Sequence, residues 1–306
     1  MTLDDIAHSQ RTVPLSAIGA DGTLTSQLQA RLAAIGLLDP PADGHFGPVS
    51  QWALRAFLQA IGRAGASVLD ASIAGRLLAA DGEVLFPLQL TTDLAGRLVR
   101  AMLGRGHWLC RHPETVNILY VEGMDLDGRK NGDKPNEFND LRVLLRIRGD
   151  GVPELQAWEA TTSPGRFYVE HPVAGPDGKP VPGAARIELG QYKAWSVGTH
   201  REGRPGAHEA LVQTRPITVS RDLDKNFQRD GDRVFTGLFG INQHWGYDMP
   251  RNRVDNASAG CLVGRARSGH REFMSTCKSD ARYRVSNGYC FMTAVIGADV
   301  VGTPAA

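Results

Sequence analysis

The residues best suited to chemistry are a histidine and a cysteine in the C-terminal third of the chain, His244 and Cys261. A thiol with an ordinary pKa of about 8.5 is only a few per cent ionised at neutral pH, so it needs a base beside it to attack a carbonyl. An imidazole can accept the thiol proton and later return it to the leaving group. The pair therefore predicts nucleophilic catalysis on a carbonyl, with Cys261 as nucleophile and His244 as general base.

The residues around this pair have types that suit supporting roles. Gly260 allows close approach of the backbone to a substrate, and we expect N–H groups around Gly260, Cys261 and Leu262 to stabilise an oxyanion. Ser258 would orient the turn that carries the thiol. Four further residues are expected to contact substrate: Asn242, Trp245, Tyr247 and His200.

Three histidines offer an alternative chemistry. His200 and His208 flank a loop rich in Gly and Arg, and together with His244 and Asp248 they have the residue types of a zinc site. Zinc carboxypeptidases of the cell wall have an Asp seven residues after the first His, but Ala207 stands there, and no later E-x-x-H follows. We expect no metal and no other cofactor, and a zinc-dependent cell-wall peptidase remains the alternative.

The segment around the cysteine resembles the L,D-transpeptidase catalytic domain. That family has a His, a loop, then Ser/Thr-His-Gly-Cys and usually an Arg. Here Ser258, Gly260 and Cys261 match, Ala259 replaces the second His, and Val263 stands where Arg is common. The resemblance implies a β-rich fold and attack on a carbonyl of the peptidoglycan stem peptide through a cysteine thioester. The two replacements favour hydrolysis or amino-acid exchange over transpeptidation.

The N-terminal part resembles a second family. An L-Q-x-x-L motif begins at Leu28, a D-G-x-F-G-P motif begins at Asp43, and an A-x-x-x-F helix begins at Ala53. This combination is similar to the peptidoglycan-binding type 1 domain, a three-helix module. The resemblance implies that the glycan strands and stem peptides of peptidoglycan are the partner, and it names no side chains that contact them.

Apolar periodicity divides the chain into three parts. Residues 1–22 are interpreted as a loose lead-in, and helical spacing over 22–82 predicts the three-helix module. We expect a helical connector over 83–112. Over 113–306, β-branched and aromatic residues alternate with polar ones between Asp-Gly and Asn-Gly turns, which predicts a β-rich catalytic domain. The expected fold class is therefore α + β and multidomain.

Composition limits the remaining functions. Lys plus Arg total 34 against 33 for Asp plus Glu, so no basic excess suggests nucleic-acid binding. No apolar run of about 18 residues predicts a membrane span. The N-terminal residues do not have the pattern of a cleavable secretory signal. We therefore expect synthesis in the cytoplasm, delivery by a secretion or lysis system, and action at the bacterial cell wall or periplasm. A wall-binding protein without catalytic activity is a further alternative.

Overall fold

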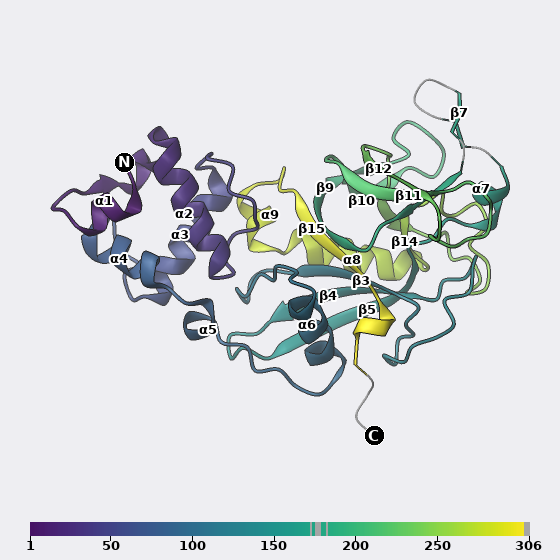
Figure 1. Ribbon diagram of the computed structural model, residues 1–306, viewed down its shortest axis with the longest axis horizontal. Helices are drawn as coiled ribbons and strands as arrows, with labels where there is room; N and C mark the ends of the chain where they lie inside the picture. The colour runs from purple at the N-terminus through teal and green to yellow at the C-terminus, as the bar shows by residue number, and fades with distance from the viewer. Residues whose placement is uncertain (172, 175–178, 182, 303–306) are drawn as a thin grey trace.

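The structure, a computed structural model, describes residues 1–171, 173–174, 179–181 and 183–302. A helical N-terminal domain is followed by a large β-rich domain, which confirms the expected α + β class (Figure 1). The N-terminal elements are α1 (Leu3–Ala7), β1 (Val13–Pro14), the 3-10 helix η1 (Leu15–Ala20), α2 (Gly22–Ala34), α3 (Pro48–Ala60), β2 (Val68–Leu69), α4 (Ala71–Ala79) and α5 (Gly82–Leu85).

Three helices, α2, α3 and α4, form the centre of the N-terminal part, as the motifs predict. Asp21 caps α2 and Asp70 caps α4 by accepting hydrogen bonds from backbone N–H groups of the first turn. Helix α3 begins with Pro48, whose fixed φ suits the first helical position. The apolar faces meet in one core, in which Leu28 and Phe57 are fully buried.

The first 20 residues belong to this domain, so the expected loose lead-in is wrong. Helix α1 packs against α4, and β1 pairs with β2 through Val13 and Leu69. Leu3 and Ile18 are buried in the same core as α2 and α3. The apolar residues of this segment are divided among a short helix, a paired strand and a 3-10 helix. Each element is too short to show a helical or strand period in the sequence.

The C-terminal part is built on an eight-stranded closed sheet in the order β10-β13-β14-β5-β4-β3-β15-β9. A three-stranded sheet, β12-β11-β8, and the β6-β7 pair accompany it. The strands are β3 (Asn117–Glu122), β4 (Asp140–Ile147), β5 (Pro153–Thr161), β6 (Val173–Ala174), β7 (Pro180–Val181), β8 (Ala184–Ile187), β9 (Gly190–His200), β10 (His208–Gln213), β11 (Ile217–Asp222), β12 (Arg233–Gly237), β13 (Gln243–Trp245), β14 (Leu262–Gly264) and β15 (Phe291–Gly297).

Helices cover two apolar surfaces of this sheet. The remaining elements are α6 (Leu94–Gly104), α7 (Arg166–Glu170), α8 (Arg267–Lys278), α9 (Ala281–Val285) and the 3-10 helix η2 (Ala298–Val300). Leu98 of α6 packs with Leu119 of β3, whereas Phe273 of α8 packs with Tyr120 of the same strand. Alternate residues of β3 therefore face different cores, and the helix expected in the connector is part of the packing of the β-rich domain. No helix in the described parts of the chain is long and apolar enough to cross a membrane.

Buried polar contacts join the two parts of the chain. Asp39, from the loop between α2 and α3, is fully buried and accepts hydrogen bonds from Arg282 and Tyr289. Burial raises the pKa of Asp39, but the cations Arg282 and Lys193 outweigh it and lower that pKa overall. Trp108 also donates its indole N–H to the backbone carbonyl of Ala33 at 2.8 Å. The two parts are thus held together by paired charges inside the molecule.

Candidate functional site

Two adjacent parallel strands position the histidine and the cysteine. In the register of β13 and β14, His244 is opposite Val263, and Cys261 comes directly before β14. Residues two apart on a strand share a face, so His244 and Cys261 are diagonal neighbours on one face of the sheet. With strands about 4.8 Å apart and about 6.6 Å between alternate residues, their Cα atoms are about 8 Å apart.

The turn before Cys261 depends on a glycine. Gly260 has φ +115°, and a Cβ built there would lie 2.3 Å from the carbonyl oxygen of Ala185. Ser258, which is buried, accepts a hydrogen bond from the Gly260 N–H at 3.1 Å and donates one to the Cys261 carbonyl at 2.9 Å. The hydroxyl of Ser258 therefore closes the turn that carries the thiol.

The thiol of Cys261 lies in a mostly apolar cluster with Phe138, Val254 and Val263, and the residue is 8% exposed. Its Sγ accepts a contact from the backbone N–H of Asn242 at 3.4 Å and donates toward the carbonyl of Gly240 at 3.7 Å. Burial raises the pKa of the thiol to about 11, and the Asn242 N–H opposes this rise. The resting cysteine is therefore a neutral thiol.

His244 has the proton arrangement that a general base needs. Its Nδ1 is 2.7 Å from the carbonyl oxygen of Trp245, which can only accept, so Nδ1 carries the proton and Nε2 keeps its lone pair. The residue is 2% exposed. Burial and then the neighbouring His200 hold its pKa well below the usual value. The imidazole is therefore neutral at physiological pH.

Asn242 fixes the tautomer of the neighbouring His200. The backbone N–H of Gln213 donates to Asn242 Oδ1 at 2.9 Å, which leaves Nδ2 to donate to His200 Nδ1 at 3.0 Å. His200 consequently carries its proton on Nε2. Its ring stacks on the ring of His244 with centroids 3.9 Å apart. Burial, followed by the effect of His208, lowers the pKa of His200 to about 4.

The other two histidines nearby have both ring nitrogens engaged. His208 donates from Nδ1 to the Gly206 carbonyl at 2.7 Å, and its Nε2 is 3.5 Å from the Trp245 N–H. His270 contacts the Glu209 carbonyl through Nε2 at 2.9 Å and a guanidinium N–H through Nδ1 at 3.1 Å. Both imidazoles have lowered pKa values, chiefly because of burial. Neither ring therefore has a nitrogen without a partner among the described residues.

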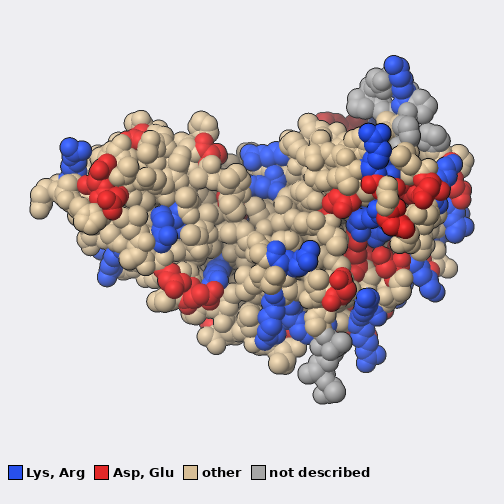
Figure 2. Space-filling view, viewed as in Figure 1, with Lys and Arg blue, Asp and Glu red and all other residues tan. Residues whose placement is uncertain are grey.

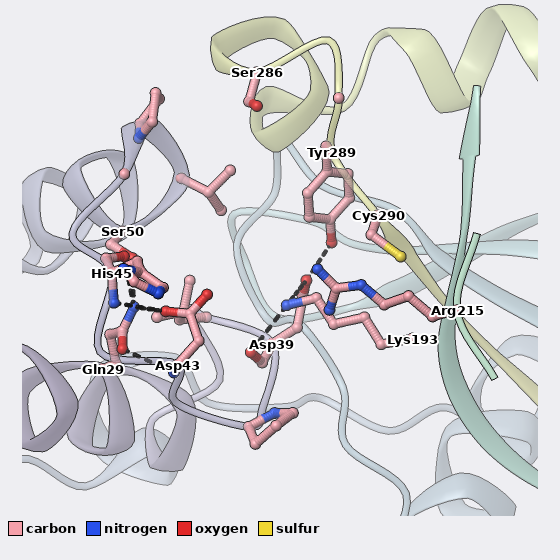
Figure 3. A pocket seen from close by; sticks show the side chains of 16 residues that line it. Gln29, Asp39, Asp43, His45, Ser50, Lys193, Arg215, Ser286, Tyr289 and Cys290 are labelled. Carbon is pink, nitrogen blue, oxygen red and sulfur yellow. Dashed lines mark hydrogen bonds and ion pairs between the residues drawn. The ribbon is translucent and has the colours of Figure 1, made fainter. Parts of the chain in front are cut away.

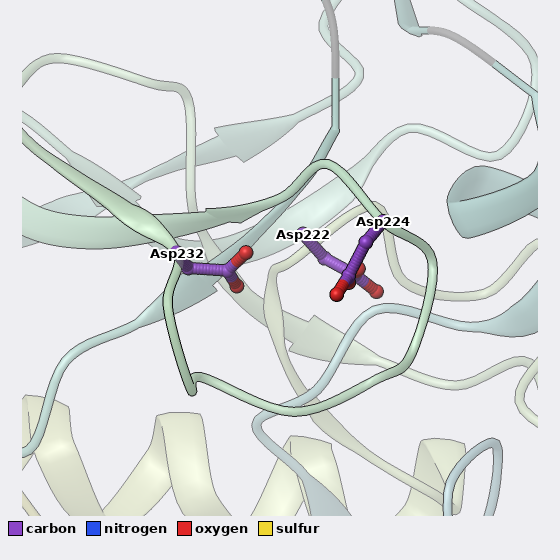
Figure 4. A group of neighbouring side chains, drawn as sticks. All are labelled: Asp222, Asp224 and Asp232. Atoms are coloured by element: carbon purple, nitrogen blue, oxygen red, sulfur yellow. The ribbon is translucent and has the colours of Figure 1, made fainter.

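The histidines do not fit a zinc site. A ligand to zinc offers a free nitrogen lone pair, but His208 uses both nitrogens, and the lone pair on Nδ1 of His200 faces an amide donor. The described part of the chain contains one group of His, Cys, Asp or Glu residues whose ligand atoms all lie within 4.8 Å of one another. It consists of Asp222, Asp224 and Asp232 and includes none of the histidines (Figure 4). We derive no step through a metal.

The structure gathers most of the residues expected at the site but changes the expected role of some. The side-chain amide of Asn242 is hydrogen-bonded to the Gln213 N–H and to His200, so it orients His200 and is not free to bind substrate. The expected oxyanion donors are mostly engaged, because the Gly260 N–H binds Ser258 and the Leu262 N–H binds the Asn242 carbonyl at 2.9 Å. Of these three expected donors, the Cys261 N–H alone has no recorded acceptor among the described residues.

The two predicted aromatic contacts lie beside the histidines. Trp245 stacks on His208 with ring centroids 3.8 Å apart, and Tyr247 has its ring centroid 6.2 Å from that of His244. The indole N–H of Trp245 is buried and has no hydrogen-bond partner among the described residues. Tyr247 has φ +60°, an unusual backbone conformation for an aromatic residue. Tyr247 therefore lies near the imidazole of His244, whereas the indole of Trp245 packs against His208.

Sequence reasoning missed a buried arginine beneath the site. Arg142 of β4 is fully buried, and its Nη2 donates to the carbonyls of His244 and Leu262 at 2.9 and 3.2 Å. It also donates from Nε to the Tyr120 hydroxyl at 2.7 Å and contacts His270 from Nη1. One guanidinium thus joins β13 and β14. Arg142 alternates with apolar residues along its strand, which indicates an exposed face, so no sequence signal identified it.

Two arginines of α8 were also missed. The guanidinium carbons of Arg267 and Arg271 each lie 5.6 Å from the ring centroid of Trp245. Arg267 is 3.3 Å from a carboxylate oxygen of Asp248, and Arg271 is exposed. The edge of the site next to Trp245 is therefore positively charged.

Comparison with known proteins identifies the N-terminal part. Residues 21–62 match the family model described as "Putative peptidoglycan binding domain". No curated protein matches the chain. Among solved structures, the chain is similar to a fused Zn-dependent amidase/peptidase/peptidoglycan-binding domain-containing protein from Clostridium acetobutylicum, at 12% identity and a TM-score of 0.28, over 94% of this chain and 100% of that one. Values at this level establish neither a shared fold nor a shared activity. The chain therefore carries a peptidoglycan-binding domain near its N-terminus.

Proposed function

We propose that this protein is a cysteine enzyme of the L,D-transpeptidase type that acts on stem-peptide carbonyls of peptidoglycan. The observation that carries the proposal is the pairing of β13 with β14. It puts a thiol and an imidazole with a fixed base tautomer on one face of the sheet, in a chain that also carries a peptidoglycan-binding domain. In this proposal the protein acts at the bacterial cell wall or periplasm and is delivered there by a secretion or lysis system.

The resting pKa values set the order of the first steps. The thiol pKa of about 11 and the depressed pKa of His244 mean that both groups are neutral before substrate binds. Proton transfer from Sγ to Nε2 of His244 therefore accompanies attack on the carbonyl carbon rather than preceding it. The Sγ–C bond forms as the carbonyl π electrons move to oxygen.

Two donors are available for the resulting oxyanion. The Cys261 N–H has no recorded acceptor among the described residues, and His200 carries a proton on Nε2. Loss of one such donor typically costs about 3 kcal/mol of transition-state stabilisation. The tetrahedral intermediate then collapses, and the C–N bond breaks as the His244 imidazolium gives its proton to the leaving amine. Water or another amine resolves the thioester by the reverse sequence, and the thiol is regenerated.

Charge at the edge of the site suits an acidic substrate. The family's usual arginine is replaced by Val263, but Arg271 of α8 lies over Trp245 and is exposed. A guanidinium there can pair with a carboxylate of the stem peptide. Recognition of the acyl donor does not depend on the missing motif arginine.

The test is to incubate the purified chain with soluble muropeptides and measure product masses. We expect product from wild type and from Cys277→Ala, a matched change at another buried cysteine, and none from Cys261→Ala at unchanged folding by circular dichroism. Two fragments whose masses sum to that of the substrate plus one water would indicate hydrolysis, and a product that carries a new amine would indicate exchange or transpeptidation. Full activity in Cys261→Ala, or loss of activity with a chelator but not with iodoacetamide, would refute the thiol mechanism. Absence of product from wild type would favour a wall-binding protein without this activity.

A further inference from the structure

A second candidate binding site lies between the peptidoglycan-binding domain and the β-rich domain. It is a cavity of about 250 Å³, and Figure 3 shows side chains from both parts converging on it. The loop before α3 contributes Asp43, His45 and Gly47, while Lys193 of β9 and Arg215 after β10 line the opposite side. The D-G-x-F-G-P motif of the N-terminal domain thus faces basic residues of the β-rich domain.

One of the two cations that line this cavity has no partner in the described part of the chain. The guanidinium of Arg215 has no recorded hydrogen bond or ion pair among the described residues, and the residue is exposed. Lys193 is 3.5 Å from the carboxylate of Asp39 and donates to the Asp39 backbone carbonyl at 3.4 Å. That carboxylate also accepts hydrogen bonds from Arg282 and Tyr289, so Lys193 shares it with two other donors. In Figure 2, Lys and Arg side chains lie at the indentation between the two parts of the molecule.

The other acidic residue of the cavity is held by groups of the N-terminal domain through one of its carboxylate oxygens. Asp43 Oδ1 accepts hydrogen bonds from Gln29 Nε2 at 2.8 Å and from the His45 N–H at 2.9 Å. The adjoining α3 has Gly47 at its N-cap with no side-chain cap, so N–H groups of its first turn lack an internal acceptor. These N–H groups add partial positive charge to the same cavity.

We propose that this cavity binds a carboxylate-bearing part of the peptidoglycan stem peptide, with Arg215 and Lys193 as its cationic contacts. Pockets for drug-sized ligands have about 300–1,000 Å³, so a cavity of about 250 Å³ suits one or two residues rather than a whole muropeptide. The identity of the ligand as stem peptide rests on the proposed function. The cavity itself is a separate binding site that the thiol chemistry does not require.

The geometry of β9 and β10 separates this cavity from the thiol site. Lys193 and His200 lie seven residues apart on β9, which corresponds to about 23 Å at about 3.3 Å per residue. His208 begins β10, and Arg215 follows its other end. The antiparallel ribbon therefore has histidines at one end and cations at the other. The cavity would hold a different unit of the wall polymer from the one that reacts with Cys261.

The first experiment changes the charge of the cavity at a position that tolerates a side chain. A Cβ at Gly47 would meet nothing within 4 Å, and its φ of −83° and ψ of −176° suit an N-cap residue. Both Gly47→Asp and Gly47→Ser should cap α3 and keep or raise Tm. We expect Gly47→Asp to weaken binding of a soluble tetrapeptide muropeptide about tenfold or more, and Gly47→Ser to bind within about twofold of wild type. Equal binding by both variants would overturn the inference.

The second experiment removes a cation. We expect Arg215→Gln to weaken muropeptide binding about tenfold in calorimetry, while Arg55→Gln, an exposed arginine on α3 outside the cavity, binds like wild type. A muropeptide with amidated carboxylates should bind wild type and Arg215→Gln equally weakly. If inorganic phosphate binds with this Arg215 dependence and the muropeptide does not, the site takes phosphate groups and the stem-peptide assignment is wrong.

The two proposals fail separately. Cys261→Ala keeps every residue of the cavity, so binding in that variant tests the cavity without turnover. Unchanged binding by Arg215→Gln would reject the cavity site and leave the thiol mechanism standing. Full turnover by Cys261→Ala would reject the proposed function, while charge-dependent binding would still establish the cavity as a site.

Discussion

Replacing Gly260 with alanine tests whether the thiol-bearing turn depends on its close approach to β8. A Cβ there would lie 2.3 Å from the Ala185 carbonyl oxygen, so the turn or β8 must move by about 1 Å to reach an ordinary contact. Overpacking of this kind costs about 1–3 kcal/mol. The φ of +115° adds about 1–3 kcal/mol for a residue with a side chain. We expect Gly260→Ala to lower the free energy of unfolding by about 4 kcal/mol.

Urea denaturation followed by tryptophan fluorescence measures this change. Gly149→Ala is the matched control, because a Cβ at Gly149 would meet no atom within 4 Å, and we expect its stability within about 0.5 kcal/mol of wild type. Displacement of the turn should also remove the contact between the Asn242 N–H and the Cys261 sulfur, so catalytic turnover should fall. A Gly260→Ala protein as stable as the Gly149→Ala control would refute the packing argument for this turn.

Three further predictions concern the groups around the thiol and imidazole. Arg142→Met leaves the buried carbonyl of His244 without its guanidinium donor, so we expect the free energy of unfolding to fall by more than about 3 kcal/mol. Thermal denaturation measures this loss. A Tm within about 2 °C of wild type, which corresponds to roughly 1 kcal/mol, would contradict the expectation. Asn242→Ala frees the tautomer of His200 and should lower kcat about tenfold with little change in KM, whereas equal kcat would show that the tautomer is unimportant. The pKa of His200 is about 4 in the folded protein, below the ordinary value of 6.5, so the unfolded chain takes up the proton first as the pH falls. The contribution of neutral His200 to stability is therefore fully present above pH 6.5 and is lost as the pH falls toward 4. The stability difference between wild type and His200→Gln should therefore shrink by about 3 kcal/mol between pH 7 and 4 in urea titrations, and a constant difference would contradict the shift.

Short-range patterns account for what the sequence predicted correctly. The start of α3 at Pro48 and the β-branched residues of β3 act within a few residues of the chain. The match of residues 21–62 confirms the N-terminal family expected from the motifs. Interactions of this kind are encoded in neighbouring residue types, so periodicity and turn signals were sufficient to predict the α + β class.

The parts that sequence reasoning missed depend on contacts between distant residues. Arg142 reaches a carbonyl 102 residues later in the chain, and Asn242 is oriented by the backbone of Gln213, 29 residues earlier. The protonation state of the Cys261 thiol also depends on distant residues, because its burial in the folded protein raises its pKa to about 11. The burial of these side chains and the register of their strands depend on the closed sheet as a whole, so a local sequence motif does not predict them.

The most direct test of the central claim is to trap the covalent intermediate on Cys261. Wild-type protein mixed with a soluble tetrapeptide muropeptide and quenched in acid within seconds should gain the mass of an acyl group, and peptide mapping should place it on the fragment that contains Cys261. Cys261→Ala should show neither adduct nor product. Product formation by wild type with no adduct, together with undiminished turnover in Cys261→Ala, would contradict the account.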